Sequence, residues 1–280
     1  MISELIRSRE LVFTLVKRDL KVRYKASTLG FLWSFGRPLF LMIIMVAVFS
    51  HIVKISTDIP YPLHLLTGLL PWMFLTGGLL DAQGSIIHNS NVVKKVYLPT
   101  ATFPAATVIS HLIHLLLAFT ILFAFILGYT LFYDAAVFPS WEIVFLPLIV
   151  AIQFVMILGL ALVLSSLNVF YRDVGSISDI VLTAWFYLTP VIYPVQKARE
   201  ELRGMFGTDL VYYLYLCNPM TPITVAYRRV LYGRHLSVAP EVSDATLLLG
   251  LGISATFAVG VFFFGAWLFR RLSPQFADEL

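Results

Sequence analysis

Two stretches of the chain, residues 143–167 and 245–269, contain no charged side chain at all. About 20 apolar residues at 1.5 Å rise cross the hydrocarbon core of a bilayer, so runs of 18 or more with few charges indicate transmembrane helices. A third stretch, 104–132, has no Asp, Glu, Lys or Arg and carries only His111 and His114. The chain is therefore predicted to be an integral membrane protein.

Three further apolar stretches are weaker candidates, because each holds or adjoins one charge. They are 29–53 with Arg37, 63–80 before Asp81, and 174–195 with Asp179. Together with the first three they predict an all-α integral membrane protein with six transmembrane helices. The composition agrees, since 59% of the residues are hydrophobic and 13% charged, against roughly 25% charged in soluble domains.

An even number of spans places both termini on one side, and short-loop cations choose that side as the cytoplasm. The cytoplasmic side of this arrangement has twelve cations: Arg7, Arg9, Lys17, Arg18, Lys21, Arg23, Lys25, Lys94, Lys95, Arg172, Arg270 and Arg271. The opposite short loops hold only Lys54. Both termini are predicted to be cytoplasmic, and the long segment 196–244 to lie outside, because cations in longer loops weigh less in this rule.

Residues 1–28 are predicted to form an amphipathic helix on the cytoplasmic face of the membrane. Apolar residues recur every four positions on one face, at Val12, Val16, Leu20 and Tyr24, and cations occupy much of the remaining surface. Such a helix lies in the interface, with its apolar face in the membrane and its cations towards anionic lipids. It serves either as a topology anchor or as a collar that guides a lipid-linked substrate.

Arg37 lies a few residues inside the first predicted span. A charge at the centre of a membrane helix costs roughly 2.5–3.5 kcal/mol on insertion scales, and less near the interface. Two roles follow from this position. The side chain either snorkels to the cytoplasmic headgroups or contacts an anion from the protein interior.

Two segments between spans are unusual. Residues 87–99 (IHNSNVVKKVYLP) predict a short cationic helix, capped by Asn89 or Ser90 and closed by Pro99. Such a helix suits an acidic groove on a partner, and the alternative is an ordinary cytoplasmic loop, which tends to be cationic in any case. Residues 210–232 alternate short apolar runs with prolines that end helices. This pattern favours a broken hairpin dipping towards a pore exit, with a surface amphipathic hairpin as the alternative.

Aromatic residues gather near the predicted outer ends of the helices. They are Trp185, Phe186, Tyr187, Tyr193, Tyr212, Tyr213 and Tyr215. Trp and Tyr form interfacial belts in most membrane proteins, and we assign most of these residues to such a belt. A flat apolar face with a hydrogen-bonding edge also suits sugars, so a few are candidate glycan contacts.

Several activities are excluded or disfavoured by what the sequence lacks. A phosphate-binding loop needs the pattern G-x-x-x-x-G-K-[ST], and no Gly-Lys pair occurs, so ATP must be hydrolysed by another polypeptide. Cys217 is the only cysteine, and the charge beside the spans points to lipids rather than nucleic acid. We expect neither a metal nor a catalytic residue. His111 and His114 favour hydrogen bonding between helices, and Asp81 and Asp179 are poor evidence for a proton relay.

The ordered motifs resemble a known family. The segment RDLKVRYKASTLGFLWSFGRPL is similar to the start of ABC type-2 exporter permeases for lipid-linked polysaccharides, which include O-antigen, capsule and teichoic acid exporters. The later blocks in the same order are GLLPWMF at 68–74, NVVKKVYLPTATFP at 91–104, YRDVG at 171–175, LTPVIYP at 188–194 and NPMTPITVAYRRVLYG at 218–233. Single blocks are weak, but the ordered set covers nearly the whole chain.

The resemblance implies a bacterial inner-membrane permease with six spans over 29–269 and a cytoplasmic tail at 270–280. It implies a homodimer with two copies of a cytoplasmic ATPase subunit, which would hold ATP and Mg²⁺, and a polyprenyl-pyrophosphate-linked glycan as cargo. Segment 89–99 would be the coupling helix and 196–244 would hold short outer gate helices.

The resemblance and the residue patterns together nominate three groups of site residues. The docking candidates are Asn91, Lys94, Lys95 and Tyr97. The headgroup or pyrophosphate candidates are Lys21, Arg23, Lys25 and Arg37. The glycan-channel candidates are Trp185, Tyr187, Tyr193, Tyr212 and Tyr213.

Two alternatives to glycan export stay open. An exporter of a drug or small lipid would share the fold but lack a sugar-lined route. A membrane glycan polymerase or acyltransferase would need a polar catalytic cluster, and His235, Glu241 and Asp244 are scattered without a recognisable spacing. A neighbouring gene for a nucleotide-binding ATPase, among glycosyltransferase genes, would favour the first reading.

Overall fold

The structure, a computed structural model, describes residues 7–25, 32–55, 57, 59–95, 98–133, 141–232 and 242–280. Every regular element in these ranges is helical. The elements are α2 (Arg9–Lys25), α3 (Leu32–Met45), the π-helix η1 (Val46–Ile52), α4 (Tyr61–His88), α5 (Ser90–Lys95), α6 (Thr102–Tyr133), the 3-10 helix η2 (Trp141–Phe145), α7 (Leu146–Phe170), α8 (Val174–Tyr187), α9 (Val195–Phe206), α10 (Leu210–Leu216), α11 (Met220–Tyr232), α12 (Asp244–Leu272), the 3-10 helix η3 (Ser273–Gln275) and α13 (Phe276–Glu279).

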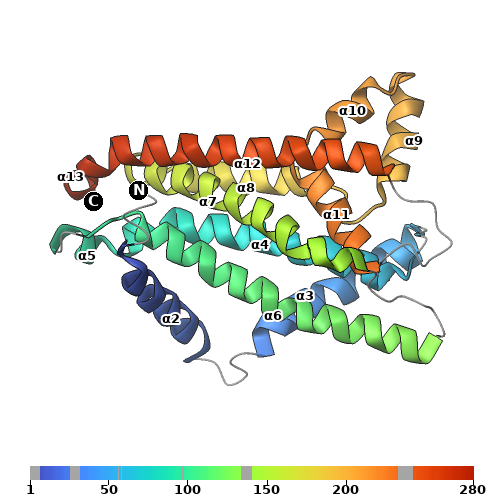
Figure 1. The fold of residues 1–280 in the computed structure, drawn as a ribbon, viewed down its shortest axis with the longest axis horizontal. Coiled ribbons are helices and arrows are strands. Elements are labelled where there is room, and N and C mark those ends of the chain that lie inside the picture. The colour runs from blue at the N-terminus through green and yellow to red at the C-terminus, as the bar shows by residue number, and fades with distance from the viewer. Residues whose placement is uncertain are drawn as a thin grey trace.

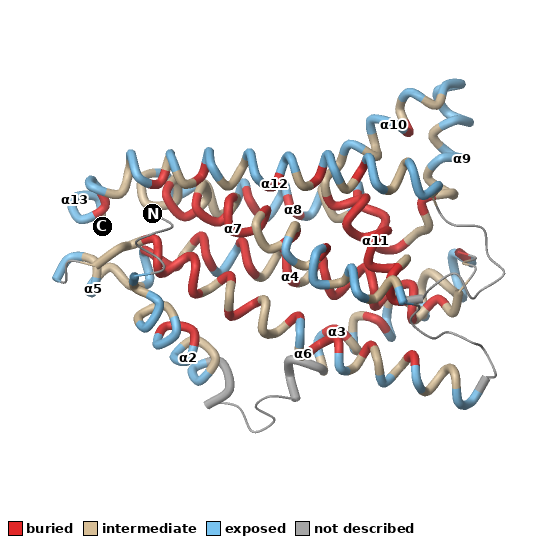
Figure 2. The backbone as a smooth tube through the Cα atoms, viewed as in Figure 1, coloured by how far each residue is buried: buried red, intermediate tan, exposed pale blue. Residues whose placement is uncertain are grey.

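Four long helices, α4, α6, α7 and α12, run along the long axis of the molecule (Figure 1). Each of the four is long and apolar enough to cross a membrane, so long apolar helices are confirmed at the predicted spans 63–80, 104–132, 143–167 and 245–269. In the most apolar part of α4, 78% of the residues are buried, whereas in that of α12 only 17% are buried. Figure 2 shows the difference, with buried residues frequent in α4 and exposed ones frequent in α12. The helix α4 is therefore the centre of the bundle, and α12 presents an apolar face for lipid or a partner.

The two other predicted spans are shorter apolar helices, Gly36–Ile52 and Val174–Tyr187. The predicted span 174–195 is too long at its end, because α8 stops at Tyr187. Its 14 residues extend over about 21 Å at 1.5 Å each, less than the roughly 30 Å of hydrocarbon. Pro190 explains the stop, since proline has no N–H to donate and its ring clashes with the carbonyl four residues earlier.

The short helices collect at the two ends of the bundle. Helices α2, α5 and α13 lie at one end, and α9 and α10 lie at the other (Figure 1). We call these the α5 end and the α9 end. Helix α11 enters the bundle from the α9 end and is mostly buried (Figure 2).

The apolar face of α2 packs on protein, which corrects the prediction that it lies against lipid. Leu15 and Val16 of α2 are buried with Phe103 and Ala106 of α6, and Leu11, Val12 and Leu20 pack around them. The start of α6 is apolar, so it covers the predicted face of α2 and removes both surfaces from water. Phe13 and Val22 stay exposed, at 60% and 68%, and are the α2 side chains available to the membrane.

Candidate functional site

The predicted docking segment holds a six-residue helix, α5, at the α5 end. Its first turn is closed by the main-chain carbonyl of Asn89, which accepts from the N–H groups of Val92 (2.9 Å) and Val93 (3.1 Å). Asn91, Lys94 and Lys95 are all exposed. Three of the four predicted docking residues are thus displayed on one short helix, and the fourth, Tyr97, lies outside the described residues.

The junction between α4 and α5 is held by Asn89. Its side-chain amide donates to the carbonyl of Ser85 at 2.7 Å, and its Oδ1 accepts from Arg18 Nη1 at 2.9 Å. Helix α13, the last helix of the chain, packs against α5. The exposed lysines therefore stand on a helix whose start is tied to both α2 and α4.

Of the predicted headgroup cations, the two whose side chains are described stand on different helices. Lys21 is exposed on α2, and Arg37 is exposed on α3. Arg23 and Lys25 belong to the last turn of α2, and their side chains lie outside the described residues. Arg37 is followed within α3 by Pro38, which is buried.

At the α9 end, the turn after α8 is organised by Asn218. Its Oδ1 accepts from Trp185 Nε1 at 2.7 Å and from the N–H of Met220 at 3.1 Å. Its Nδ2 donates to the carbonyl of Leu188 at 2.9 Å and to Thr189 Oγ1 at 3.1 Å. One amide side chain thereby satisfies main-chain groups that the end of α8 and the start of α11 leave open.

The same turn is held against α4 by main-chain acceptors. Arg228 of α11, only 4% exposed, donates from Nη2 to the carbonyls of Pro190 (2.5 Å) and Val191 (3.1 Å). Tyr61 of α4 donates from its hydroxyl to the carbonyl of Ile192 at 3.0 Å. A Cβ at Gly68 would lie 3.0 Å from the Val191 oxygen and 3.1 Å from Arg228 Nη2. Glycine at that position lets the turn and the arginine approach α4.

A second arginine links three elements at the α9 end. Arg229 Nη2 donates to Asp244 Oδ1 at 2.5 Å, and its Nε lies 3.8 Å from Glu142 Oε2. Glu142 is in η2, Arg229 in α11 and Asp244 opens α12. The carboxylate of Asp244 also complements the positive end of the α12 dipole. Ion pairs thus hold α11 between the starts of two spans.

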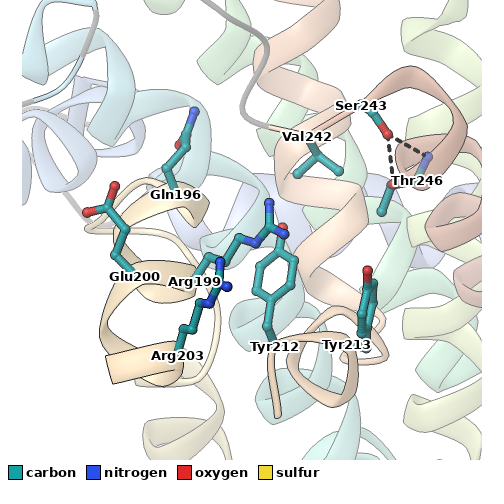
Figure 3. A pocket seen from close by; sticks show the side chains of 9 residues that line it. All are labelled: Gln196, Arg199, Glu200, Arg203, Tyr212, Tyr213, Val242, Ser243 and Thr246. Carbon is teal, nitrogen blue, oxygen red and sulfur yellow. Dashed lines mark hydrogen bonds between the residues drawn. The ribbon is translucent and has the colours of Figure 1, made fainter. Parts of the chain in front are cut away.

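A cavity of about 490 Å³ opens at the α9 end between α9, α10 and the start of α12. Its lining side chains are Gln196, Arg199, Glu200, Arg203, Tyr212, Tyr213, Val242, Ser243 and Thr246 (Figure 3). The Arg199 guanidinium lies over the Tyr212 ring, 5.2 Å from its centroid. A hydrogen bond to Asp209, 3.4 Å away, raises the pKa of Arg199. Aromatic faces beside amide, hydroxyl and charged groups are the chemistry that binds a sugar's C–H face and its hydroxyls.

The predicted glycan residues separate into two groups. Tyr212 and Tyr213 line this cavity. Tyr212 is buried, with 6% of its surface exposed, whereas Tyr213 is 56% exposed. The other three surround the turn after α8. Trp185 packs edge-on to Trp72 with ring centroids 6.1 Å apart, the Tyr193 hydroxyl donates to the Tyr187 carbonyl at 2.7 Å, and only Tyr187 has a largely exposed side chain.

Sequence reasoning missed Asn218 and Arg228 as organising residues. In the sequence, both residues stand out only as members of the block NPMTPITVAYRRVLYG at 218–233. A signal was present for Arg228, because an arginine within the apolar run VAYRRVLY must find acceptors if the helix is buried. The expected helix–helix bonding by histidine is confirmed for His111, whose Nε2 lies 2.7 Å from Asp81 Oδ2.

Comparison with known proteins gives a consistent picture. The O-antigen export system permease protein RfbA of Myxococcus xanthus is 28% identical over 281 aligned positions, covering 100% of this chain and 99% of the relative. RfbA of Klebsiella pneumoniae is 28% identical over 97% of this chain and 95% of its own. The polysialic acid transport protein KpsM of Escherichia coli is 22% identical over 88% and 92%.

The family profile described as ABC-2 type transporter matches residues 10–232, which is most of the chain. The match runs from α2 through α11 and includes α5, the turn after α8 and both arginines of α11. With its apolar helices, it identifies a multi-pass membrane protein. The chain belongs to the ABC-2 type transporter family.

Proposed function

We propose that this chain is the membrane-spanning subunit of an ATP-driven exporter of a polyprenyl-pyrophosphate-linked polysaccharide in a bacterial inner membrane. The observation that carries the proposal is the full-length similarity to two O-antigen export permeases, joined by a polysialic acid transport protein. Three relatives that carry polysaccharide favour such a cargo over a drug or small lipid.

In this proposal two copies of the chain pair, and each binds one copy of a cytoplasmic ATPase subunit. The α5 end faces the cytoplasm, as the count of cations predicts, and α5 is the docking helix. The remaining two crossings are made by α3 with η1, and by α8 together with the turn that follows it. The cavity lined by Tyr212 and Tyr213 then lies on the outer side and contacts the emerging glycan.

Deleting the gene for this chain in its host is expected to abolish the surface polysaccharide while its lipid-linked form accumulates inside. A permease is required for the crossing but not for synthesis. Surface glycan is measured by labelling intact cells, and lipid-linked glycan by extraction. Normal surface glycan together with sensitivity to an apolar drug would favour the drug exporter, and loss of the lipid-linked form itself would favour an enzyme.

The purified chain is expected to show no ATP hydrolysis above a heat-denatured sample, and its complex with the cognate ATPase is expected to show hydrolysis. The reason is the missing phosphate-binding loop. Phosphate release is measured for the permease, the ATPase and the complex at equal concentrations. Robust hydrolysis by the lone chain, with contaminants excluded by mass spectrometry, would contradict the assignment.

Tyr213→Ala is expected to slow export by about two- to tenfold while leaving the amount of folded protein unchanged. An aromatic stacking contact contributes about 0.5–1.5 kcal/mol, and tenfold corresponds to about 1.4 kcal/mol. The ring of Tyr213 is exposed and contacts that of Tyr212, with centroids 5.9 Å apart. The matched control is Tyr171→Ala, which removes a ring that is also exposed, at 64%, between α7 and α8. Equal export by the two variants would mean that Tyr213 belongs to the interfacial aromatic belt and does not contact the glycan.

A further inference from the structure

A second cavity of about 490 Å³ lies between α2, α4 and α6, near the α5 end. Pockets of roughly 300–1,000 Å³ are the usual size for small ligands. One wall is apolar and comes from Leu15, Val22, Phe103 and Ala106. The remaining lining is polar and comes from Arg18, Asp19, Asp81, Ser85, His88, Asn89, Thr107, Ser110 and His114. None of these residues was a predicted site residue.

The floor of the cavity carries a carboxylate. Asp81 lies seven residues before the end of α4 at His88, which is about 10 Å along the helix. Its Oδ2 lies 2.7 Å from His111 Nε2, and the Asp81 side chain is 48% exposed while that of His111 is 8% exposed. Asp81 follows the predicted span 63–80 within the same helix, and an ionisable residue in a membrane helix usually faces a cavity or the bundle interior. The open side of Asp81 is thus directed at the cavity rather than at packed protein.

The other charged side of the cavity is formed by Arg18. This side chain donates from Nη1 to Asn89 Oδ1 at 2.9 Å and from Nη2 to Asp19 Oδ1 at 3.1 Å. It retains 45% exposure, so it can meet a further acceptor. His88 and His114 add imidazole groups to the same lining.

The cavity therefore presents a carboxylate and a guanidinium to one space, beside an apolar wall that continues to the surface of α2. An anionic headgroup would be attracted by Arg18 but repelled by Asp81 and Asp19. A purely cationic ligand would be attracted by Asp81 and Asp19 but repelled by Arg18. A ligand with both charges, a phosphate and an ammonium, and with an acyl chain for the apolar wall, satisfies all three surfaces.

We propose that this cavity binds the headgroup of a zwitterionic phospholipid with a primary ammonium, as in phosphatidylethanolamine. The ammonium lies at Asp81, where it donates hydrogen bonds to the carboxylate, and the phosphate lies at Arg18. A bound lipid would join α2 to α4 and α6 through its headgroup. The proposal is independent of the cargo that the protein moves.

The test measures lipid retention by native mass spectrometry of the full-length protein. The protein is taken from nanodiscs of phosphatidylethanolamine and phosphatidylglycerol, or of phosphatidylcholine and phosphatidylglycerol. The unmodified chain is expected to retain phosphatidylethanolamine preferentially, because a quaternary ammonium donates no hydrogen bond to a carboxylate. Asp81→Asn preserves shape and hydrogen bonding to His111 and is expected to weaken that retention at least about tenfold, because the amide offers the lipid ammonium no negative charge. Asp179→Asn is the matched control, because Asp179 is an exposed aspartate of α8 outside this cavity.

Equal retention by the Asp81 and Asp179 variants would overturn the proposal, as would equal retention of phosphatidylcholine or a preference for phosphatidylglycerol. Arg18→Gln tests the phosphate side without altering the span, and it is expected to lower retention as well. If the Asp81 variant does not fold, the Arg18 variant decides. Unchanged retention by Arg18→Gln would then overturn the assignment.

Discussion

Gly159→Ala is expected to lower the amount of folded protein several-fold, because α7 and α12 touch through their main chains at this position. A Cβ at Gly159 would lie 2.6 Å from the main-chain nitrogen of Phe262 and 2.7 Å from its Cα. Across the same contact, a Cβ at Gly265 would press on the carbonyl oxygen of Gly159. Main-chain atoms cannot rotate away as a side chain can, so the helices must separate. Overpacking costs about 1–3 kcal/mol, occasionally more, which exceeds the roughly 1 kcal/mol that alanine gains over glycine in a helix.

The matched control for this prediction is Gly260→Ala, five residues from Gly265 on the same helix. A Cβ at Gly260 would meet nothing within 4 Å, so this variant is expected to fold as well as the unmodified chain. Folded protein is measured by gel filtration of a fluorescent fusion, and thermal stability by the temperature at which that peak disappears. Equal behaviour of the two variants would show that α7 and α12 do not approach as closely as the structure describes.

The four long spans could be predicted because their signal is local. A run such as 245–269 is apolar all round, and no arrangement of neighbours is needed to decide that it is a membrane helix. The prediction for α8 was too long, because hydropathy averaged over a stretch does not detect where a helix ends. Pro190 is the sequence signal for that end, since proline has no N–H to donate. Val12, Val16 and Leu20 of the predicted face of α2 do share one packed face, while the side chain of Tyr24 lies outside the described residues. Whether lipid or protein covers that face depends on the position of α6.

The partners of the organising residues at the α9 end could not be predicted, because they are distant in sequence. Trp185 and Asn218 are 33 positions apart, and Arg228 and Pro190 are 38 apart. Each bond forms only after α11 has entered the bundle beside the turn that follows α8. The cavity lined by Asp81 likewise forms only where α2, α4 and α6 meet. The sequence draws attention to Asp81 and His114 as polar residues in or beside apolar runs, but not to the cavity they line.

Reversing both exposed lysines of α5, as Lys94→Glu with Lys95→Glu, is expected to reduce co-purification of the cognate ATPase about tenfold or more. The prediction rests on the proposed docking role of α5. An exposed ion pair contributes only about 0.2–1 kcal/mol, but reversal replaces attraction by like-charge contact, which costs several kcal/mol. Tenfold corresponds to about 1.4 kcal/mol. Export and stimulated ATP hydrolysis are expected to fall together, because both require the docked subunit.

The same reversal removes cytoplasmic charge, which by itself can disturb membrane orientation. The control is Arg270→Glu with Arg271→Glu, which makes an equal change of charge at the end of α12, outside α5. Single cysteines labelled from each side establish the orientation of both variants. Normal orientation with lost co-purification only in the α5 variant would support docking at α5. If the two variants lose the ATPase equally, the effect is one of general charge at this end, and unchanged assembly in the α5 variant would mean that Lys94 and Lys95 serve orientation alone.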